Sequence, residues 1–563
     1  MSITAITIEN FKGIREPVRV ELKPITLLFG PNSAGKSTIV QALHYAHEIF
    51  ERQNLNPDRT LLGGDSIDLG GFENLVNQHD LKRPVIFRFE LDLSGEDLPD
   101  YKDGYEELEH WSSMEADDEI EQKHIDLFQN ISSKANKAEV AVTIRWSNTL
   151  EKPIISSYAI SINDIELAEV KSSDDTRQIE LSRFNIFNFV FYSDEEIKII
   201  MNPIRKALAA EDYSEAVELV SKLGLMESIG WVIDTDKINP FFLTYGENAS
   251  ISLHEQTSAM PVWGKPLTID TSLWNEEASS FNEWGFFIKM LSSLITGPGE
   301  LVRDELRKLC YVGPLREVPK RGHKPVTSPE ESRWANGLAA YDTLFFAEDN
   351  FIDKVNEWLT QEERLNSGYS VELKKYRELE TDNPVMLAAL QGRILDEDID
   401  LSESLLALPV KRRLLIRDAA RGIELVPQDI GTGISQVLPV VVAALHRKTG
   451  LVAIEQPELH IHPAFQVALG DLFIEQVRQR PDLTFILETH SEHLMLRFLR
   501  RVRETGENEA PENRTLSPNE LSIYFIEQHE TGISCLPIRV DEDGDFIDHW
   551  PHGFFSERSE ELF

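Results

Sequence analysis

Residues 25–38 read ITLLFGPNSAGKST, and this stretch decides the fold. Ile25–Phe29 is apolar nearly throughout, which is typical of a parallel strand that is covered on both faces. Gly30–Ser37 meets the pattern G-x-x-x-x-G-K-[ST] in full, and apolar residues then recur at helical spacing from Thr38 to Ile49. A strand, a glycine loop and a helix in this order predict a phosphate-binding loop.

The residue types of the loop indicate how it would bind ATP and magnesium. Small residues let successive backbone N–H groups wrap the phosphates, and the following helix adds its positive N-terminal end. We expect Lys36 to neutralise the β and γ phosphates and Ser37 to hold Mg2+. A plain glycine turn before a helix is the alternative, which the flanking strand and helix disfavour. The expected nucleotide-contacting residues are Gly30, Pro31, Asn32, Ser33, Ala34, Gly35, Lys36, Ser37 and Thr38.

Composition limits the class of protein. The 563 residues are too many for one compact core, and 96 acidic against 56 basic residues leave a net charge of -40. Such an average surface repels phosphate, which disfavours a generic electrostatic nucleic-acid binder. Cys310 and Cys535 cannot build a disulfide framework, and no stretch of about 18 apolar residues occurs. We expect a cytoplasmic protein that does not enter a membrane.

Strand-like patterns occur on both sides of a long middle region. Alternating apolar residues predict an N-terminal hairpin, and similar alternation covers 85–93, 139–146 and 154–170. The acidic stretch from about Glu96 to Glu121 is more typical of a solvated insertion than of a binding surface. Helical patterns are expected over the segments 195–230, 276–310 and 336–365.

A second strand-rich tract begins near Arg412. It includes a short buried strand that ends at Glu455, about 420 residues after Lys36. Either this acidic site is unrelated to the loop, or a large insertion separates two halves of one nucleotide-binding domain. The second interpretation is favoured because the C-terminal half supplies several further motif matches in one order.

Five segments carry a resemblance to a known group: ITIENFKGI, GPNSAGKS, DIGTGISQ, AIEQPELHIHP and ETHSEHL. Together they resemble the ABC-type ATPase heads of the SMC and RecF group. They are most similar to the branch of overcoming-lysogenization-defect (OLD)-like and Septu-type antiphage ATPase subunits that lack a Toprim domain. The terminal segment DHWPHGFFSERSEELF resembles a tail of stand-alone ATPases in that branch.

The resemblance covers roughly 1–95 and 410–563, and it implies an α/β fold. We expect a P-loop head with a mixed sheet, flanking helices and an antiparallel β lobe, split by a large mixed α+β insertion. The expected parts are 1–95 with the Walker A loop, 96–410 as β-lobe continuation and mainly helical insertion, 411–510 with the signature, Walker B, D-loop and H-loop motifs, and 511–563 as a tail segment packed on the head.

By the same resemblance, Gly433, Ser435 and Gln436 form the signature motif, which in the group reaches across a dimer to the γ-phosphate bound by the other protomer. A serine N-cap of the next helix is the alternative for Ser435, and both roles can hold together. Lys12 is a phosphate or adenine-side contact, or an ordinary surface lysine. Gln78 and His79 lie where a nucleotide-sensing loop would be expected, but their match is weak.

The acidic motif departs from the group at one position. Glu455 corresponds to the residue that binds magnesium through water, and Gln456 stands where relatives usually carry the glutamate that activates water. An amide can orient a water but cannot take its proton. Hydrolysis is therefore expected to be slow, or Glu458 serves instead, or ATP is trapped.

His490 matches the switch histidine that contacts the γ-phosphate. A zinc cluster of four histidines is disfavoured because their spacing matches no standard zinc site. These histidines are His460, His462, His490 and His493.

The resemblance implies a homodimer that closes around ATP and controls an effector protein, expected to be a nuclease on a partner chain, in antiphage defence. One alternative is a DNA-repair or DNA-structure sensor, in which basic groups at Lys411–Arg421, Arg316–Lys324 or Arg497–Arg503 contact a duplex. The other is a scaffold that binds ATP without hydrolysing it. The acidic cluster in VDEDGDF is more typical of a solvated turn than of a nuclease site.

Overall fold

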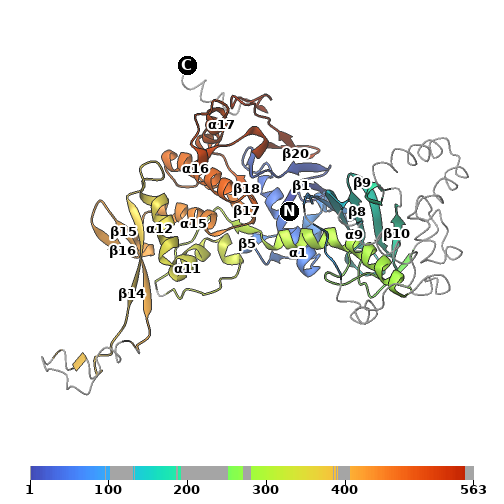
Figure 1. Ribbon diagram of the computed structural model, residues 1–563, viewed down its shortest axis with the longest axis horizontal. Coiled ribbons are helices and arrows are strands. Elements are labelled where there is room, and N and C mark those ends of the chain that lie inside the picture. Colours follow the sequence, from blue (N-terminus) through green and yellow to red (C-terminus); the bar gives the residue numbers. More distant parts are fainter. Residues whose placement is uncertain are drawn as a thin grey trace, which may run out of the picture.

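The computed structural model describes residues 2–95, 97–101, 131, 134–185, 188–191, 251–270, 281–321, 323–383, 386–387, 390, 406 and 408–551. The helical segment expected over 195–230 and most of the acidic stretch expected after Glu96 lie outside these residues. Two packed units dominate Figure 1, a central mixed sheet with its helices and an antiparallel β lobe. The expected α/β fold with a mixed sheet and flanking helices is confirmed.

The central sheet has six strands in the order β13-β17-β18-β3-β19-β20. The first five run parallel, and β20 closes the sheet antiparallel to β19. Every residue of β3 and β17 is buried, as the apolar sequence predicts for strands covered on both faces. The strands are β13 (Cys310–Val312), β17 (Gly450–Glu455), β18 (Leu483–Glu488), β3 (Ile25–Phe29), β19 (Leu521–His529) and β20 (Gly532–Pro537).

Strands from distant parts of the chain meet on either side of β3. On one side Phe485 of β18 pairs with Ile25, and on the other side Leu521 of β19 pairs with the same residue. The strand before the N-terminal glycine loop and the strands that carry C-terminal motifs therefore form one sheet. β13, which lies within the segment expected as an insertion, forms an edge strand of this sheet.

The β lobe is a nine-stranded antiparallel sheet in the order β12-β11-β10-β9-β8-β7-β6-β1-β2. Burial alternates along β7, which matches the apolar and polar alternation of its sequence. The strands are β1 (Ser2–Glu9), β2 (Val18–Glu21), β6 (Val85–Asp92), β7 (Lys137–Ser147), β8 (Lys152–Ile162), β9 (Ile165–Ser172), β10 (Ile179–Phe184), β11 (Ile251–His254) and β12 (Thr268–Ile269).

The strand-like segment 154–170 is a hairpin of two strands. β8 and β9 are joined by Asn163 and Asp164, whose φ angles are 51° and 65°. Two consecutive left-handed residues make the tight turn whose twist suits a hairpin, and Asn and Asp tolerate that conformation.

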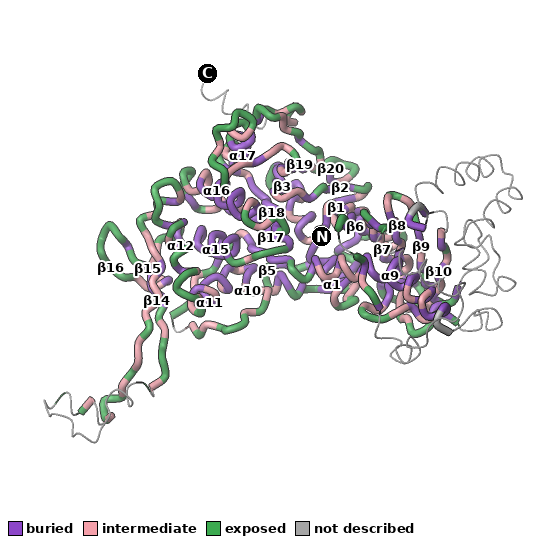
Figure 2. The backbone as a smooth tube through the Cα atoms, viewed as in Figure 1, coloured by how far each residue is buried: buried purple, intermediate pink, exposed green. Residues whose placement is uncertain are grey.

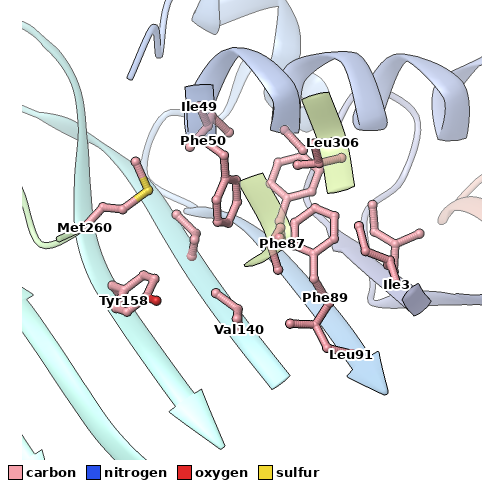
Figure 3. Packing of buried hydrophobic residues seen from close by; sticks show 14 of the residues in the cluster. Ile3, Ile49, Phe50, Phe87, Phe89, Leu91, Val140, Tyr158, Met260 and Leu306 are labelled. Atoms are coloured by element: carbon pink, nitrogen blue, oxygen red, sulfur yellow. The ribbon is translucent and has the colours of Figure 1, made fainter. Parts of the chain in front are cut away.

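Helix α1 (Lys36–Arg52) and helix α9 (Phe281–Arg307) pack in the core that joins the β lobe to the central sheet. Figure 3 shows Phe50 of α1 close to Phe89 of β6, and their ring centroids are 5.5 Å apart. The first turn of α1 follows the phosphate-binding loop directly. Packing of its far end against β6 therefore fixes the direction in which the loop points.

A second core lies on the opposite face of the central sheet and contains residues of several further helices. The helices are α10 (Ser332–Ala335), α11 (Leu338–Phe346), α12 (Asp349–Thr360), α15 (Thr432–His446), α16 (Pro463–Gln479) and α17 (Glu492–Gly506). The chain also forms the short elements β4 (Arg59–Thr60), β5 (Gly64–Asp68) and α2 (Phe72–Leu75). In the described part of the chain, no helix has the length and apolar character that crossing a bilayer requires.

A three-stranded antiparallel sheet extends from the α12 side of the head. It consists of β14 (Tyr369–Tyr376), β15 (Lys411–Asp418) and β16 (Ile423–Leu425), in the order β14-β15-β16. Figure 1 shows β14 and β15 running outward from the helices, and Figure 2 shows that their outer parts are less buried than the core.

A buried ion-pair network ties α16 to α17 and to the segment after it. Arg501 donates to Asp471 from two nitrogens at 2.8 and 2.9 Å, and the two side chains are only 7% and 4% exposed. Arg514 contacts Asp471 at 3.4 Å and donates to Glu475 at 2.7 Å. Because these charges are removed from water, removing one partner leaves a buried charge unpaired and destabilises the fold.

We predict that Asp471→Ala destabilises the protein by about 3 kcal/mol, since it leaves the buried Arg501 guanidinium without its two-pronged acceptor. Urea denaturation measures the change in the free energy of unfolding. Asp482→Ala, which removes an exposed carboxylate just before β18, is the matched control and should change stability by less than about 0.5 kcal/mol. Equal effects of the two substitutions would contradict the prediction.

Candidate functional site

The loop between β3 and α1 depends on two glycines. Gly30 has φ 150° and Gly35 has φ 97°, a backbone conformation that side chains disfavour. A Cβ on Gly30 would meet the carbonyl oxygen of Ile526 in β19, and one on Gly35 would meet the side chain of Ile533 in β20. Ile533 also lies against Gly13, so the turn after β1 and the phosphate-binding loop contact the same side chain.

The Lys36 side chain turns back over this loop. Its Nζ donates to the carbonyl oxygens of Gly30 at 3.0 Å and Pro31 at 2.8 Å, and the residue is 4% exposed. Burial lowers the pKa of Lys36, and the nearby Glu488, Glu458 and Glu455 oppose that shift. The loop therefore carries a buried cation close to three carboxyl groups.

Ser37 contacts Glu488, an acid to which the sequence motifs assigned no role. Its hydroxyl donates to Oε2 of Glu488 at 2.8 Å, across 451 positions of sequence. Glu488 is the last residue of β18, and it lies directly opposite Glu455, the last residue of the neighbouring parallel strand β17. The sequence did hold a signal, because each of these strands is apolar until it ends in a glutamate.

Burial and a neighbouring acid raise the proton affinity of both glutamates. Burial first and the charge of Glu488 second raise the pKa of Glu455 to about 8, although hydrogen bonding by Tyr311 and the charges of Arg316 and Lys36 oppose this. Burial also raises the pKa of Glu488, against the hydrogen bond from Ser37. The pair therefore holds a proton near neutral pH in the ligand-free protein.

Both carboxylate oxygens of Glu458 accept hydrogen bonds from the turn that carries His490. One carboxylate oxygen accepts from Thr489 Oγ1 at 2.7 Å, and the other accepts from the backbone N–H of His490 at 2.7 Å. Burial lowers the pKa of His490, and the charge of Lys36 adds to this effect. His490 is consequently neutral at pH 7, and among the described residues its buried Nε2 has no hydrogen-bond partner.

The main chain turns sharply after Glu455. Gln456 has φ 46°, in the left-handed region, and its N–H donates to the carbonyl oxygen of Glu488 at 2.7 Å. The Arg316 guanidinium donates to the carbonyl oxygens of Glu455 at 2.7 Å and Gln456 at 3.1 Å. Strain of this kind persists where surrounding contacts hold it, and it often marks functional sites.

Arg316 begins the basic group Arg316–Lys324 that the sequence offered as a duplex contact, but its own side chain is buried. The residue is 4% exposed, and burial lowers the pKa of its guanidinium to about 10, so it stays charged at neutral pH. Gln436 donates from Nε2 to the carbonyl oxygen of Arg316 at 2.8 Å. Arg316 thus joins the start of α15 to the end of β17.

The candidate signature residues lie in the first turn of α15. The N-cap of that helix is Gly431, and the Ser435 hydroxyl donates to the carbonyl oxygen of Thr432 at 2.8 Å, so the N-cap interpretation of Ser435 is wrong. A Cβ on Gly433 would lie 3.5 Å from the carbonyl oxygen of His460, which places the start of α15 beside the loop after β17. Among the described residues, no hydrogen bond or ion pair joins Gly433 or Ser435 to the Lys36 loop.

Lys12 lies in a turn that packs on the segment after α2. Its N–H donates to Leu75 at 2.6 Å, and its carbonyl oxygen accepts from the Asn77 side chain at 2.7 Å. Burial lowers the pKa of the Lys12 ammonium, and Asp68 opposes that shift. Gln78 and His79, whose match to a nucleotide-sensing loop is weak, come directly after Asn77 and have φ angles of 54° and 56°.

Comparison with known proteins finds ATPase domains in both halves of the chain. The family described as "AAA ATPase domain" matches residues 1–174, and the family described as "AAA domain, putative AbiEii toxin, Type IV TA system" matches residues 328–496. The family described as "Protein of unknown function (DUF3696)" matches residues 516–563. The two AAA matches support an ATP-binding ATPase domain that both halves of the chain build together. No curated protein matches the sequence.

Solved structures similar to the chain include three SMC heads at low identity. A SmcHead bound to the C-winged helix domain of ScpA has 8% identity and a TM-score of 0.37, and covers 96% of this chain and 99% of its own. The Smc head domain with an extended coiled coil bound to the C-terminal domain of ScpA from Pyrococcus furiosus has 10% identity and a TM-score of 0.34, with 100% and 98% covered. The SMC head domain from Thermotoga maritima has 8% identity and a TM-score of 0.33, with 96% and 100% covered.

The acid pair gives a prediction for the metal-free protein. Because the folded-state pKa of Glu455 is about 8 and an unfolded glutamate titrates near about 4.3, the pair's contribution to stability is lost as pH rises through this window. Glu488→Gln removes the repulsion. We expect it to raise the free energy of unfolding by about 1–3 kcal/mol at pH 8 and by much less at pH 5.

Thermal and urea unfolding in the presence of a chelator would measure this pH dependence. Glu363→Gln removes an exposed carboxylate and serves as the control, with no gain expected at either pH. A stability change in Glu488→Gln that is the same at pH 5 and pH 8 would contradict the assigned cause.

Proposed function

We propose that the chain is an ATP-hydrolysing switch that dimerises around ATP and controls a partner effector protein. The observation that carries the proposal is the contact between Ser37 of the phosphate-binding loop and Glu488, beside Glu455 on the next strand. A loop that wraps phosphates and two adjacent carboxyl groups are the parts that ATP hydrolysis requires.

The residues at this edge of the sheet fit Mg2+. Ser37 Oγ and the carboxyl groups of Glu488 and Glu455 are oxygen donors, the ligand type this ion prefers. Among the described residues, no group of three or more acidic, His or Cys side chains forms a metal cage. Such a sparse set suits an ion that keeps waters and binds substrate phosphates, and when bound the ion would neutralise charge on them.

The contacts suggest a division of roles between the two glutamates. Ser37 bonds Glu488 and not Glu455, so we assign Glu488 to the metal side of the site. With Glu488 on the metal side, we assign to Glu455, at the end of the adjacent strand, the role of accepting a proton from water. This assignment explains how the site can tolerate an amide at Gln456. Glu458 is a weaker candidate for the base, because both its oxygens already accept hydrogen bonds.

The proposal of a dimer rests on the signature residues and on the resemblance to SMC- and RecF-type heads. Gly431 and Thr432 are exposed at the start of α15, and the first N–H groups of a helix are free to bind an anion. We infer that this helix start meets the γ-phosphate held by the other protomer. ATP that contacts both protomers only in the closed dimer would select that state.

The net charge of -40 suits a basic effector protein, because opposite charge steers association. By resemblance to OLD-like and Septu-type systems, we propose a nuclease as the effector and antiphage defence as the setting. A scaffold that never hydrolyses ATP is the competing proposal, and Gln456 is the residue that favours it.

The shared site is tested by mixing inactive protomers. We expect Lys36→Ala and Ser435→Arg each to abolish ATP hydrolysis alone, and an equimolar mixture to recover roughly a quarter of wild-type activity, since one composite site of a mixed dimer has both motifs intact. Steady-state phosphate release measures this. Absence of any recovery, with mixed dimers shown by native mass spectrometry, would refute the shared site.

Two conservative variants separate the glutamate roles. We expect Glu455→Gln to lower kcat by about 100-fold or more with ATP affinity unchanged, as loss of a general base does. Glu488→Gln should instead raise the Mg2+ concentration needed for half-maximal activity. Glu363→Gln is the control and should leave both quantities unchanged. Wild-type turnover that stays at background, and does not rise in Gln456→Glu, would favour the scaffold.

A further inference from the structure

The ribbon formed by β14 and β15 concentrates positive charge in an acidic protein. The 16 residues of these strands hold six Lys or Arg and two acidic residues, whereas the whole chain has 56 basic and 96 acidic residues. The six basic residues are Lys374, Lys375, Lys411, Arg412, Arg413 and Arg417. Clustering of this kind is the electrostatic mark of a surface that binds an anion.

The strand register places like charges directly opposite one another. Lys374 pairs with Arg413, and Lys375 pairs with Arg412. Cross-strand pairs of like charge destabilise a sheet, whereas an acidic residue opposite each basic one would stabilise it. The arrangement therefore costs stability, and an anion bound at Lys374 and Arg413 would offset the cost of that pair.

The inner face of the ribbon explains how it is anchored. Val371 pairs with Ile416 and Leu373 pairs with Leu414, and these residues pack in the core beside α12. The α12 residue Asn356 also accepts from the N–H of Val371 at 2.6 Å and donates to its carbonyl oxygen at 2.9 Å. The base of the ribbon is thus rigidly seated on the head.

Since side chains alternate along a strand, the residues between these positions face outward. The outward face carries four basic residues, Lys374, Lys411, Arg413 and Arg417, and the acids Glu372 and Glu424. The Arg413 guanidinium lies over the ring of Tyr376, 5.1 Å from its centre.

Internal ion pairs do not neutralise this face strongly. Lys374 contacts Glu424 at 2.6 Å, with both side chains more than 40% exposed, and Lys411 contacts Glu378 in a similarly exposed pair. Exposed pairs contribute only about 0–1 kcal/mol each, so phosphate groups can replace these carboxylates.

We propose that the β14–β15 ribbon binds double-stranded DNA by its outward basic face. The major groove of B-form DNA admits a two-stranded ribbon, while the major groove of A-form RNA is too deep and narrow for one. Cations on a narrow projecting element can reach phosphates on both sides of that groove. The inference stands independently of ATP hydrolysis.

The test measures binding of the full-length protein to a labelled 20-base-pair DNA duplex of mixed sequence by fluorescence anisotropy at several salt concentrations. Lys411→Gln with Arg413→Gln should weaken binding at least about 10-fold and reduce the slope of log affinity against log salt by about 2, one unit for each lost phosphate contact. The charge-conserving Lys411→Arg with Arg413→Lys should retain binding.

Arg500→Gln with Arg503→Gln is the matched control, because it removes two exposed positive charges from α17 on another part of the head. It should change affinity by less than about 2-fold. Thermal unfolding and ATP binding of each variant verify that it is folded.

Several outcomes would overturn the proposal. These are failure of the wild type to bind DNA at low salt, equal losses in the ribbon and control variants, and tighter binding of an RNA duplex of the same length. Ribbon-dependent binding of polyglutamate as tight as that of DNA would show that the surface takes an acidic protein instead. Loss of DNA binding with unchanged ATP hydrolysis would support this inference and leave the proposed switch intact.

Discussion

The rest of the structure depends on the parallel pairing of β18 with β3. Both strands end at the same edge of the central sheet, so the last residue of one lies beside the loop that follows the other. This register brings Glu488 within hydrogen-bond distance of Ser37, and pairing of β17 with β18 then adds Glu455. Without this pairing, Ser37 of the glycine loop would lie apart from Glu488 and Glu455.

The same register lowers the stability of the folded protein at this site. Two adjacent buried carboxyl groups repel each other, and Gln456 holds a left-handed conformation without being glycine. The surroundings offset this through Lys36 and through Arg316, which fixes the turn by its bonds to two carbonyl oxygens. Sites that bind highly charged ligands are commonly less stable than the fold permits, because their charges are arranged for the ligand.

Local patterns predicted the parts of the fold that local physics determines. The glycine loop with its strand and helix, and the alternating strands of the β lobe, follow from residue size and hydrophobic period over a few positions. Glu488 could not be placed in this way, because its contact with Ser37 depends on the pairing of strands about 450 residues apart. Arg316 was misjudged because its neighbours in REVPKRGHK are polar, whereas its burial is set by α15 and β17. The turn at Asn163 was missed because alternation continues through it.

Only a short stretch of chain separates the basic ribbon from the first turn of α15. β16 ends at Leu425, and after a single 3-10 turn at Pro427–Asp429 the chain enters α15 at Thr432. A duplex that moves the ribbon would therefore act on the helix whose first turn carries Ser435. By linkage, if DNA on the ribbon changes the affinity for ATP, ATP must change the affinity for DNA by the same factor. The size of that factor is set by how rigidly the segment from Leu425 to Thr432 transmits movement, and the buried Pro427 restricts its freedom.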